Sequence, residues 1–155
     1  MPEWSTLSPG QIVDGLREIV GAEGPMHAMR AYQLLIRATG GQRVGRELRR
    51  VLNQVTARGL RQGHLAQLVD SISGQTDKTL YLPGTEPVIV RALGPRLLFE
   101  VPRSEVNALV QMLDLEGPSH VIHRGVLDTL GLTRLTDRTR DYLDECLAYR
   151  WTPGD

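Results

Sequence analysis

This chain of 155 residues has only one cysteine and one lysine, few aromatic residues (5%) and no long apolar run. A single cysteine, Cys146, cannot form a disulfide within the chain, which favours a reducing compartment. No apolar stretch approaches the ~20 residues of a membrane span, and the first residues lack the charged and apolar regions of a signal peptide. These absences predict a cytoplasmic protein with no membrane contact.

Residues suited to metal binding or catalysis are also few. His120 and His123 are three residues apart, but no carboxylate or cysteine completes a metal-ligand set around them. Cys146 is expected to be a small buried apolar group. The segment 73–79 weakly resembles a phosphate-binding loop, yet Asp77 stands where a glycine must precede the lysine. We therefore expect no catalytic residue, no metal and no cofactor, and not an enzyme.

Charge is unevenly distributed along the chain, although the net charge is zero. Residues 1–80 carry 10 basic and 7 acidic groups, a net charge of +3, and residues 81–155 carry 8 and 11, a net charge of −3. Arginine accounts for 17 of the basic residues and lysine for one. Arginine suits contacts to phosphate and guanine, but a GC-rich genome produces the same bias, and composition alone leaves both explanations open.

An internal repeat with a period of about 93 residues organises the sequence. Residues 23–27, Glu-Gly-Pro-Met-His, return as residues 116–120, Glu-Gly-Pro-Ser-His. After a gap of two residues, the apolar series of residues 44–55 aligns with residues 135–146. We therefore predict two copies of one structural unit.

Each copy has apolar positions at three- and four-residue steps, which predicts three helices. In the first copy, Gly24 is expected to end the first helix in a left-handed conformation, and Pro25 to start the second. The third helix is expected over residues 44–60, where the periodicity is clearest. After it, residues 65–69 and 79–82 predict a hairpin with a loose tip.

Three helices followed by a two-stranded ribbon is the order of a winged helix-turn-helix module. A second hairpin is expected from residues 88–93 and 96–101 around Gly94-Pro95. The predicted fold is mainly α with small β hairpins, an α+β class, with two winged helix-turn-helix units in tandem and the second truncated. The expected boundaries are 8–84 for unit 1, 85–101 for the linking hairpin and 102–151 for unit 2.

Three short motifs resemble a known family. They are residues 23–27, the segment Arg43-Val-Gly-Arg-Glu-Leu48, and Glu100-Val-Pro-Arg-Ser-Glu105. Together they are similar to the winged-helix domain of unknown function at the C-terminus of large bacterial superfamily 1 helicase-like proteins. The second copy departs from the motif, with Thr136-Asp137 in place of Gly45-Arg46. The resemblance implies association with nucleic-acid processing or defence, and no catalytic residues.

The third helix of the first copy is the element expected to enter a DNA major groove. Its outer face and ends are basic and polar, with six arginines and one acidic residue between residues 43 and 61. Arginine can bind guanine with two hydrogen bonds, and Asn or Gln can bind adenine. The candidate contacts to double-stranded DNA are Arg43, Arg46, Arg49, Arg50, Asn53, Gln54, Arg58 and Arg61, with Lys78, His64 and Gln75 supplying donors from the wing.

Two alternatives stay open from the sequence. An arginine-rich helix face is often only solvated, and Glu47 is positioned to pair with Arg50 or Arg43. The corresponding helix of the second copy is acidic, which would repel phosphate. That face therefore favours packing, homodimer formation or the binding of a basic helicase or nuclease partner, with Asp137, Asp141, Asp144 and Glu145 as candidate contacts.

Overall fold

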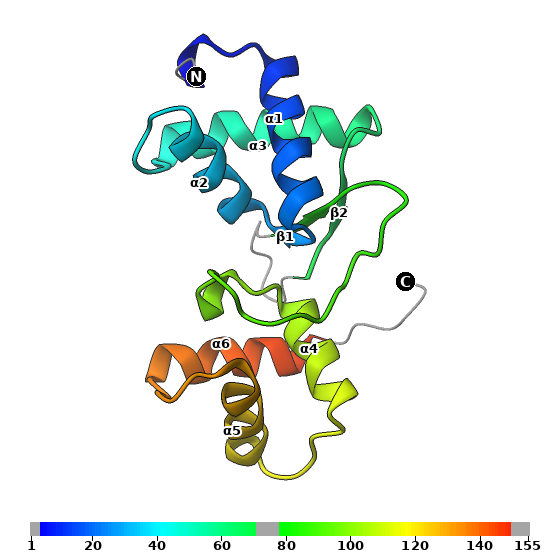
Figure 1. Ribbon diagram of the computed structural model, residues 1–155, viewed down its shortest axis with the longest axis vertical. Helices are drawn as coiled ribbons and strands as arrows, with labels where there is room; N and C mark the ends of the chain where they lie inside the picture. Colours follow the sequence, from blue (N-terminus) through cyan, green and yellow to red (C-terminus); the bar gives the residue numbers. More distant parts are fainter. Residues whose placement is uncertain (1–3, 71–77, 150–155) are drawn as a thin grey trace. The chain divides into compact units, whose positions relative to one another are not determined.

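The computed structural model describes residues 4–70 and 78–149 and divides the chain into two compact units. Unit 1 comprises Met1–Val69 and Asp77–Pro87, and unit 2 comprises Asp70–Thr76 and Val88–Asp155. The described residues form six α-helices and one small antiparallel sheet (Figure 1). The protein is therefore mainly helical with a minor β component. None of the helices in the described ranges combines the length and the apolar character needed to span a bilayer.

Unit 1 holds three helices and all three strands of the described chain. Its elements follow the short 3-10 helix Trp4–Thr6 in the order α1 (Pro9–Glu23), β1 (Met26–His27), α2 (Ala28–Ala38), α3 (Arg46–Arg61), β2 (Ala66–Leu68) and β3 (Thr79–Tyr81). The strand order is β1-β3-β2 with both pairs antiparallel. Leu80 lies opposite Met26 on one side and Gln67 on the other. The predicted first hairpin is therefore confirmed, and β1 is an additional strand.

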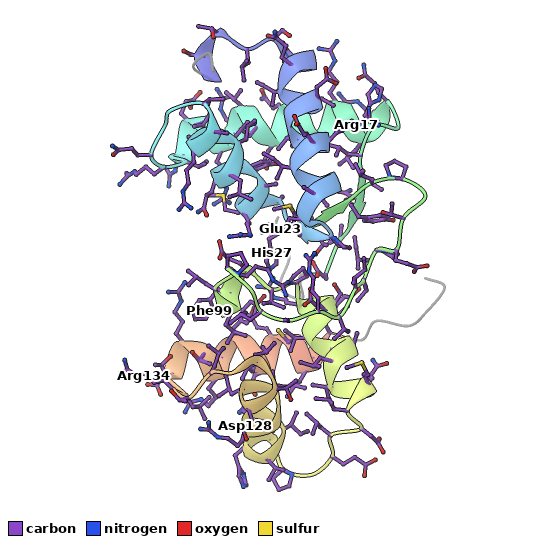
Figure 2. The ribbon with its side chains drawn as sticks, viewed as in Figure 1. Arg17, Glu23, His27, Phe99, Asp128 and Arg134 are labelled. Carbon is purple, nitrogen blue, oxygen red and sulfur yellow. The ribbon has the colours of Figure 1, made fainter. Side chains whose placement is uncertain are left out.

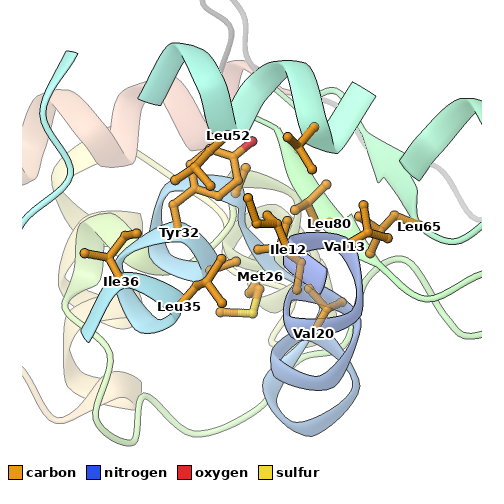
Figure 3. Packing of buried hydrophobic residues seen from close by; sticks show 14 of the residues in the cluster. Ile12, Val13, Val20, Met26, Tyr32, Leu35, Ile36, Leu52, Leu65 and Leu80 are labelled. Atoms are coloured by element: carbon orange, nitrogen blue, oxygen red, sulfur yellow. The ribbon is translucent and has the colours of Figure 1, made fainter. Parts of the chain in front are cut away.

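The core of unit 1 lies between its three helices and the sheet (Figure 3). Leu16 of α1, Met26 of β1 and Leu80 of β3 are completely shielded from solvent. Tyr32 of α2 and Leu52 of α3 are each only 1% exposed. Because α3 turns its apolar stripe into this cluster, its opposite face is left for solvent.

The start of α1 and the start of α3 follow from local sequence. Ser8 and Gln11 form a capping box, in which the Gln11 N–H donates to Ser8 Oγ at 3.2 Å and the Ser8 N–H donates to Gln11 Oε1 at 2.8 Å. Gly45, in an extended conformation, precedes α3. The observed helix Arg46–Arg61 confirms the predicted third helix with a shift of two residues at its start and one at its end.

The corner between α1 and α2 differs from the prediction. Gly24 is extended, with φ −65° and ψ 168°, and is not left-handed. Its N–H donates to Val20 O at 2.7 Å, and a Cβ atom there would lie 2.5 Å from the same oxygen. The glycine is therefore required for a close backbone approach. Pro25 does not start α2 either, since β1 intervenes before the helix begins at Ala28.

Unit 2 consists of helices without a sheet in its described part. The elements are the 3-10 helix η2 (Leu98–Glu100), α4 (Arg103–Met112), α5 (Ser119–Leu130) and α6 (Asp137–Ala148). Leu127 and Cys146 are completely buried, and Val126 and Leu143 are each 1% exposed. Gly117, with φ +111°, occupies the left-handed region at the corner that corresponds to Gly24.

The predicted second hairpin is wrong. Residues 88–93 and 96–101 form no strands, although a turn is present at Gly94-Pro95. The buried Arg96 side chain explains the difference, because its guanidinium donates to Leu93 O at 3.1 Å and Ala92 O at 3.0 Å. These carbonyls bind the guanidinium, and Arg96 turns inward to the Glu105 carboxylate, with N–O distances of 2.8 and 2.9 Å. In this segment, the hydrogen bonds of the Arg96 side chain to the backbone carbonyls and to Glu105 take the place of strand pairing.

A distant carboxylate caps the first turn of α4. Asp70 Oδ2 accepts hydrogen bonds from the Ser104 N–H at 3.2 Å and the Ser104 hydroxyl at 2.9 Å. Asp70 is fully buried, and residue Pro102, before the helix, provides no side-chain cap. A negative charge at a helix N-terminus is favourable because the free N–H groups there are electropositive. Asp70 lies two residues after the end of β2 and belongs to unit 2.

Several residues that the sequence repeat aligns in α3 and α6 have matching burial. Leu52 and Leu143 are each 1% exposed, and Val55 and Cys146 are both buried. Elsewhere the burial of aligned residues differs. Pro9 is exposed whereas Pro102 is buried, and His27 is buried whereas His120 is exposed. Val20 is buried, but its counterpart Leu113 is 38% exposed, because α4 stops at Met112 and is shorter than α1. The helices α1, α2 and α3 of unit 1 correspond in order to α4, α5 and α6 of unit 2. The origin of the two units by duplication stays a prediction.

Candidate nucleic-acid interface

The outer face of α3 is the most basic surface that the sequence predicts. Leu48, Leu52, Val55, Thr56 and Gly59 of this helix are buried. The side chains around the opposite face and at the helix ends are exposed, and these are Arg43, Arg46, Arg49, Arg50, Gln54, Arg58 and Arg61. One helix therefore brings most of the predicted DNA contacts to solvent.

Glu47 partly neutralises this face. Its carboxylate accepts a hydrogen bond from Arg50 Nη2 at 2.6 Å, with the Arg50 and Glu47 side chains 64% and 76% exposed. The neighbouring guanidinium lowers the pKa of the Glu47 carboxyl. The predicted local pairing is thus confirmed for Arg50. An exposed ion pair of this kind is weak and easily exchanged for another anion.

The other arginines of the interface carry no such compensation. In the parts of the chain that the structure describes, no carboxylate forms an ion pair with Arg43, Arg46, Arg49 or Arg61. Arg58 lines a shallow pocket of about 140 Å³ together with Asp14 and His64. The N-terminal half of α3 and the loop before it therefore carry the least balanced positive charge of this surface.

Asn53 lies at the inner edge of the face and is only half-exposed. Its Oδ1 is 2.9 Å from the hydroxyl of Tyr32, which is also 2.9 Å from Thr56 Oγ1. Burial raises the pKa of Tyr32, opposed by its hydrogen bond to Thr56 and by the nearby Arg49 charge. Tyr32 and Thr56 are functional candidates that the sequence did not reveal, since their positions matched an apolar core. A buried tyrosine hydroxyl usually has a hydrogen-bond partner, so the tyrosine at an apolar position could have indicated a polar contact.

The wing residues are placed only in part. Lys78 immediately precedes β3 and is half-buried, which lowers the pKa of its ammonium group. Its carbonyl accepts the Ala28 N–H at 2.9 Å and so anchors the strand to the start of α2. His64 is exposed after α3. Gln75 and the segment 73–77 of the loop-like motif lie outside the described residues.

The acidic residues of α6 are largely engaged within unit 2. Glu145 Oε2 lies 2.7 Å from Nη2 of the buried Arg103, and Asp144 Oδ1 lies 2.7 Å from Nε2 of the buried His123. Asp137 and Asp141 are exposed, and both face Arg140, at 3.4 and 3.8 Å. Four carboxylates thus have basic neighbours. The role of this face in binding a basic partner stays a prediction.

The histidines and the cysteine singled out in the sequence differ in their exposure to solvent. His120 is exposed, whereas His123 is buried against Asp144. Within the described ranges, no three His, Cys, Asp or Glu side chains are grouped closely enough to hold a metal ion. Cys146 is fully buried, as predicted, and burial raises the pKa of its thiol. A buried neutral thiol is a poor nucleophile.

Comparisons with family models, curated proteins and solved structures found no match for this chain.

Proposed function

We propose that the protein is a non-enzymatic winged-helix DNA-binding protein in which α3 of unit 1 contacts double-stranded DNA. The observation that carries the proposal is the row of exposed arginines on α3, which faces away from the core of its own unit. The resemblance to the helicase-associated winged-helix domain agrees with it.

The arrangement of unit 1 supports the winged-helix part of the proposal. A helix, a short strand, two further helices and an antiparallel ribbon follow one another, and β3 pairs with both β1 and β2. The α2–α3 pair is then the helix-turn-helix, with α3 as the helix that enters the groove. The ribbon of β2 and β3 is the wing. Unit 2 repeats the three helices and is proposed as the truncated copy.

Electrostatics supports the same face. Each arginine that neutralises a phosphate releases counterions from the duplex, so binding through this surface must weaken as salt rises. The Arg50–Glu47 pair adds a condition, because a phosphate has to compete with Glu47 for the guanidinium. Arg46 and Arg49, without an ion pair among the described residues, are expected to contribute more.

The proposal is tested by fluorescence anisotropy of a labelled duplex at several salt concentrations. We expect wild-type affinity to fall steeply with salt, and the triple variant R46A/R49A/R50A to bind weakly with a slope of log affinity against log salt smaller by about 2 to 3. The matched control is R17A/R124A/R134A, which removes the same charge from exposed positions outside α3. Two of these positions, Arg17 and Arg134, are labelled in Figure 2.

The control variant should retain a slope close to that of the wild type. If the α3 variant and the control weaken binding equally, net charge and not α3 determines the affinity. If the triple variant binds as the wild type does, or if the wild type shows no salt-dependent binding, the proposed function is wrong.

A further inference from the structure

A pocket of about 140 Å³ opens within unit 1, between the first turns of α1 and the C-terminal end of α3. Its lining residues are Pro9, Gly10, Val13 and Asp14 on one side and Arg58, Gln62 and His64 on the other. Val13 is buried in the core of unit 1, and the other lining residues are exposed. An apolar residue of the core and charged residues of the surface therefore meet in one cavity.

The packing of α1 against α3 fixes the two sides of this pocket. A Cβ atom at Gly59 of α3 would lie 3.4 and 3.5 Å from the two Cγ atoms of Val13, so the helices approach closely there. Gly63, with φ +78°, ends α3 with a left-handed turn, in which the His64 N–H donates to Gly59 O at 2.9 Å. The core and this turn together hold the backbone of both sides in place.

Opposite charges line the pocket without neutralising one another. Asp14 comes from α1 and Arg58 from α3. Within the described residues, no side-chain hydrogen bond or ion pair involves Asp14, Arg58, Gln62 or His64. A carboxylate that accepts and a guanidinium that donates are therefore both available to a ligand in the same cavity.

The charges and the volume restrict the class of ligand. An anion at Arg58 is repelled by Asp14, and a cation at Asp14 is repelled by Arg58. A molecule that carries both charges satisfies the two side chains at once. An apolar cavity of about 150 Å³ holds benzene, which has about six non-hydrogen atoms, so the pocket suits a ligand of similar size.

We infer that this pocket binds a small zwitterion of the free α-amino acid class, with its ammonium group at Asp14 and its carboxylate at Arg58. A guanidinium can bind a carboxylate through two parallel hydrogen bonds. The inference goes beyond the proposed function and does not rest on it, because the pocket belongs to unit 1 whether or not α3 binds DNA. Occupancy engages Arg58, which is also one of the candidate DNA contacts.

The inference is tested by adding L-alanine to the ¹⁵N-labelled protein without DNA and following the amide resonances. We expect saturable chemical-shift changes centred on residues 9–14 and 58–64. A dissociation constant in the millimolar range is expected for so small a ligand. Acetate and methylammonium each carry one of the two charges, and each should bind about tenfold more weakly than L-alanine.

Two variants test the charged residues separately. D14N and R58A each alter an exposed side chain, so both proteins should stay folded, and each should weaken the binding of L-alanine about three- to tenfold. The matched controls are D128N and R134A, which remove the same charges from exposed positions of unit 2 that are labelled in Figure 2. Both controls should bind L-alanine as the wild type does.

The inference is overturned if L-alanine causes no saturable change at residues 9–14 and 58–64. It is also overturned if acetate or inorganic phosphate binds there as tightly as L-alanine, since the pocket is then a site for anions alone. Wild-type affinity in D14N, or equal losses in the variants and their controls, would contradict it as well. Each of these results leaves the proposed function intact, which only the duplex-binding measurements can overturn.

Discussion

Single arginines of this chain have two different environments. On α3 they are exposed and mostly free of ion pairs, which leaves their guanidinium groups available to an anionic ligand. In unit 2, Arg96 and Arg103 are buried and paired with Glu105 and Glu145. Burial of a guanidinium is tolerated only where a carboxylate and further acceptors compensate the lost hydration. The arginine-rich composition therefore has both a structural and a surface component.

The Arg96–Glu105 pair is expected to be the largest single polar determinant of unit 2 stability. Both side chains are almost fully buried, and two N–O contacts of 2.8 and 2.9 Å join them. E105A leaves the Arg96 charge buried without its partner and should lower the free energy of unfolding by about 3 to 5 kcal/mol. Urea unfolding followed by circular dichroism measures the change.

The control for this prediction is E47A, which removes a carboxylate from an exposed ion pair on α3. It should change stability by less than about 1 kcal/mol. A loss in E105A as small as that in E47A would mean that the buried pair is not a determinant of stability.

Residue roles on α3 were predictable from the sequence to the extent that periodicity defines a face. The arginines at three- and four-residue steps from the apolar stripe are exposed as expected. Asn53 is the exception, because its Oδ1 binds a tyrosine 21 positions away, at a contact that no local pattern encodes. Side-chain partners across helices depend on tertiary packing and lie beyond sequence periodicity.

At the scale of elements, α6 shows how one helix serves two surfaces. Its inner face buries Tyr142, Leu143 and Cys146, and its outer face carries the acidic residues. Burial raises the pKa of the Cys146 thiol above its usual value of 9.0 and that of the Tyr142 phenol above 10.0. In the folded state both groups therefore stay protonated at pH values where the unfolded chain ionises.

The raised pKa values predict that stability falls in alkaline solution. Well below pH 9, both states hold these protons and the stability is unaffected. As the pH rises above about 9, the unfolded chain releases protons that the folded chain retains, so unfolding becomes more favourable. Midpoints of urea unfolding between pH 7 and about 10.5 should be flat at first and then decline. C146A should decline less steeply, and an equal decline in both proteins would exclude the thiol as a cause.

Elements with a strong period were predicted well, and elements without one were not. The apolar stripe of α3 gave its bounds within two residues. β1 was missed because two residues, Met26–His27, are too few to display alternation. The segment 88–101 resembled a hairpin by composition, yet the Arg96 guanidinium takes the carbonyls of residues 92 and 93. Apolar runs beside a turn do not show whether the backbone carbonyls pair with a second strand or accept hydrogen bonds from a buried side chain.

At the scale of the whole molecule, two helical units carry different charge and different secondary structure. Only unit 1 has a sheet among the described residues, and the third helices of the two units differ in sign on their outer faces. The repeat and the zero net charge were visible in the sequence. The pairing of Glu145 and Asp144 was not, since their partners Arg103 and His123 lie far from them along the chain.

The central claim, that α3 is the surface that binds duplex DNA, is tested most directly by adding an unlabelled duplex to the ¹⁵N-labelled protein and following its amide resonances. The account predicts that the largest chemical-shift changes fall on residues 43–61, with smaller ones at Lys78, and that rising salt reverses them. Changes concentrated on residues 137–148, or no change at DNA concentrations that saturate anisotropy, would contradict it.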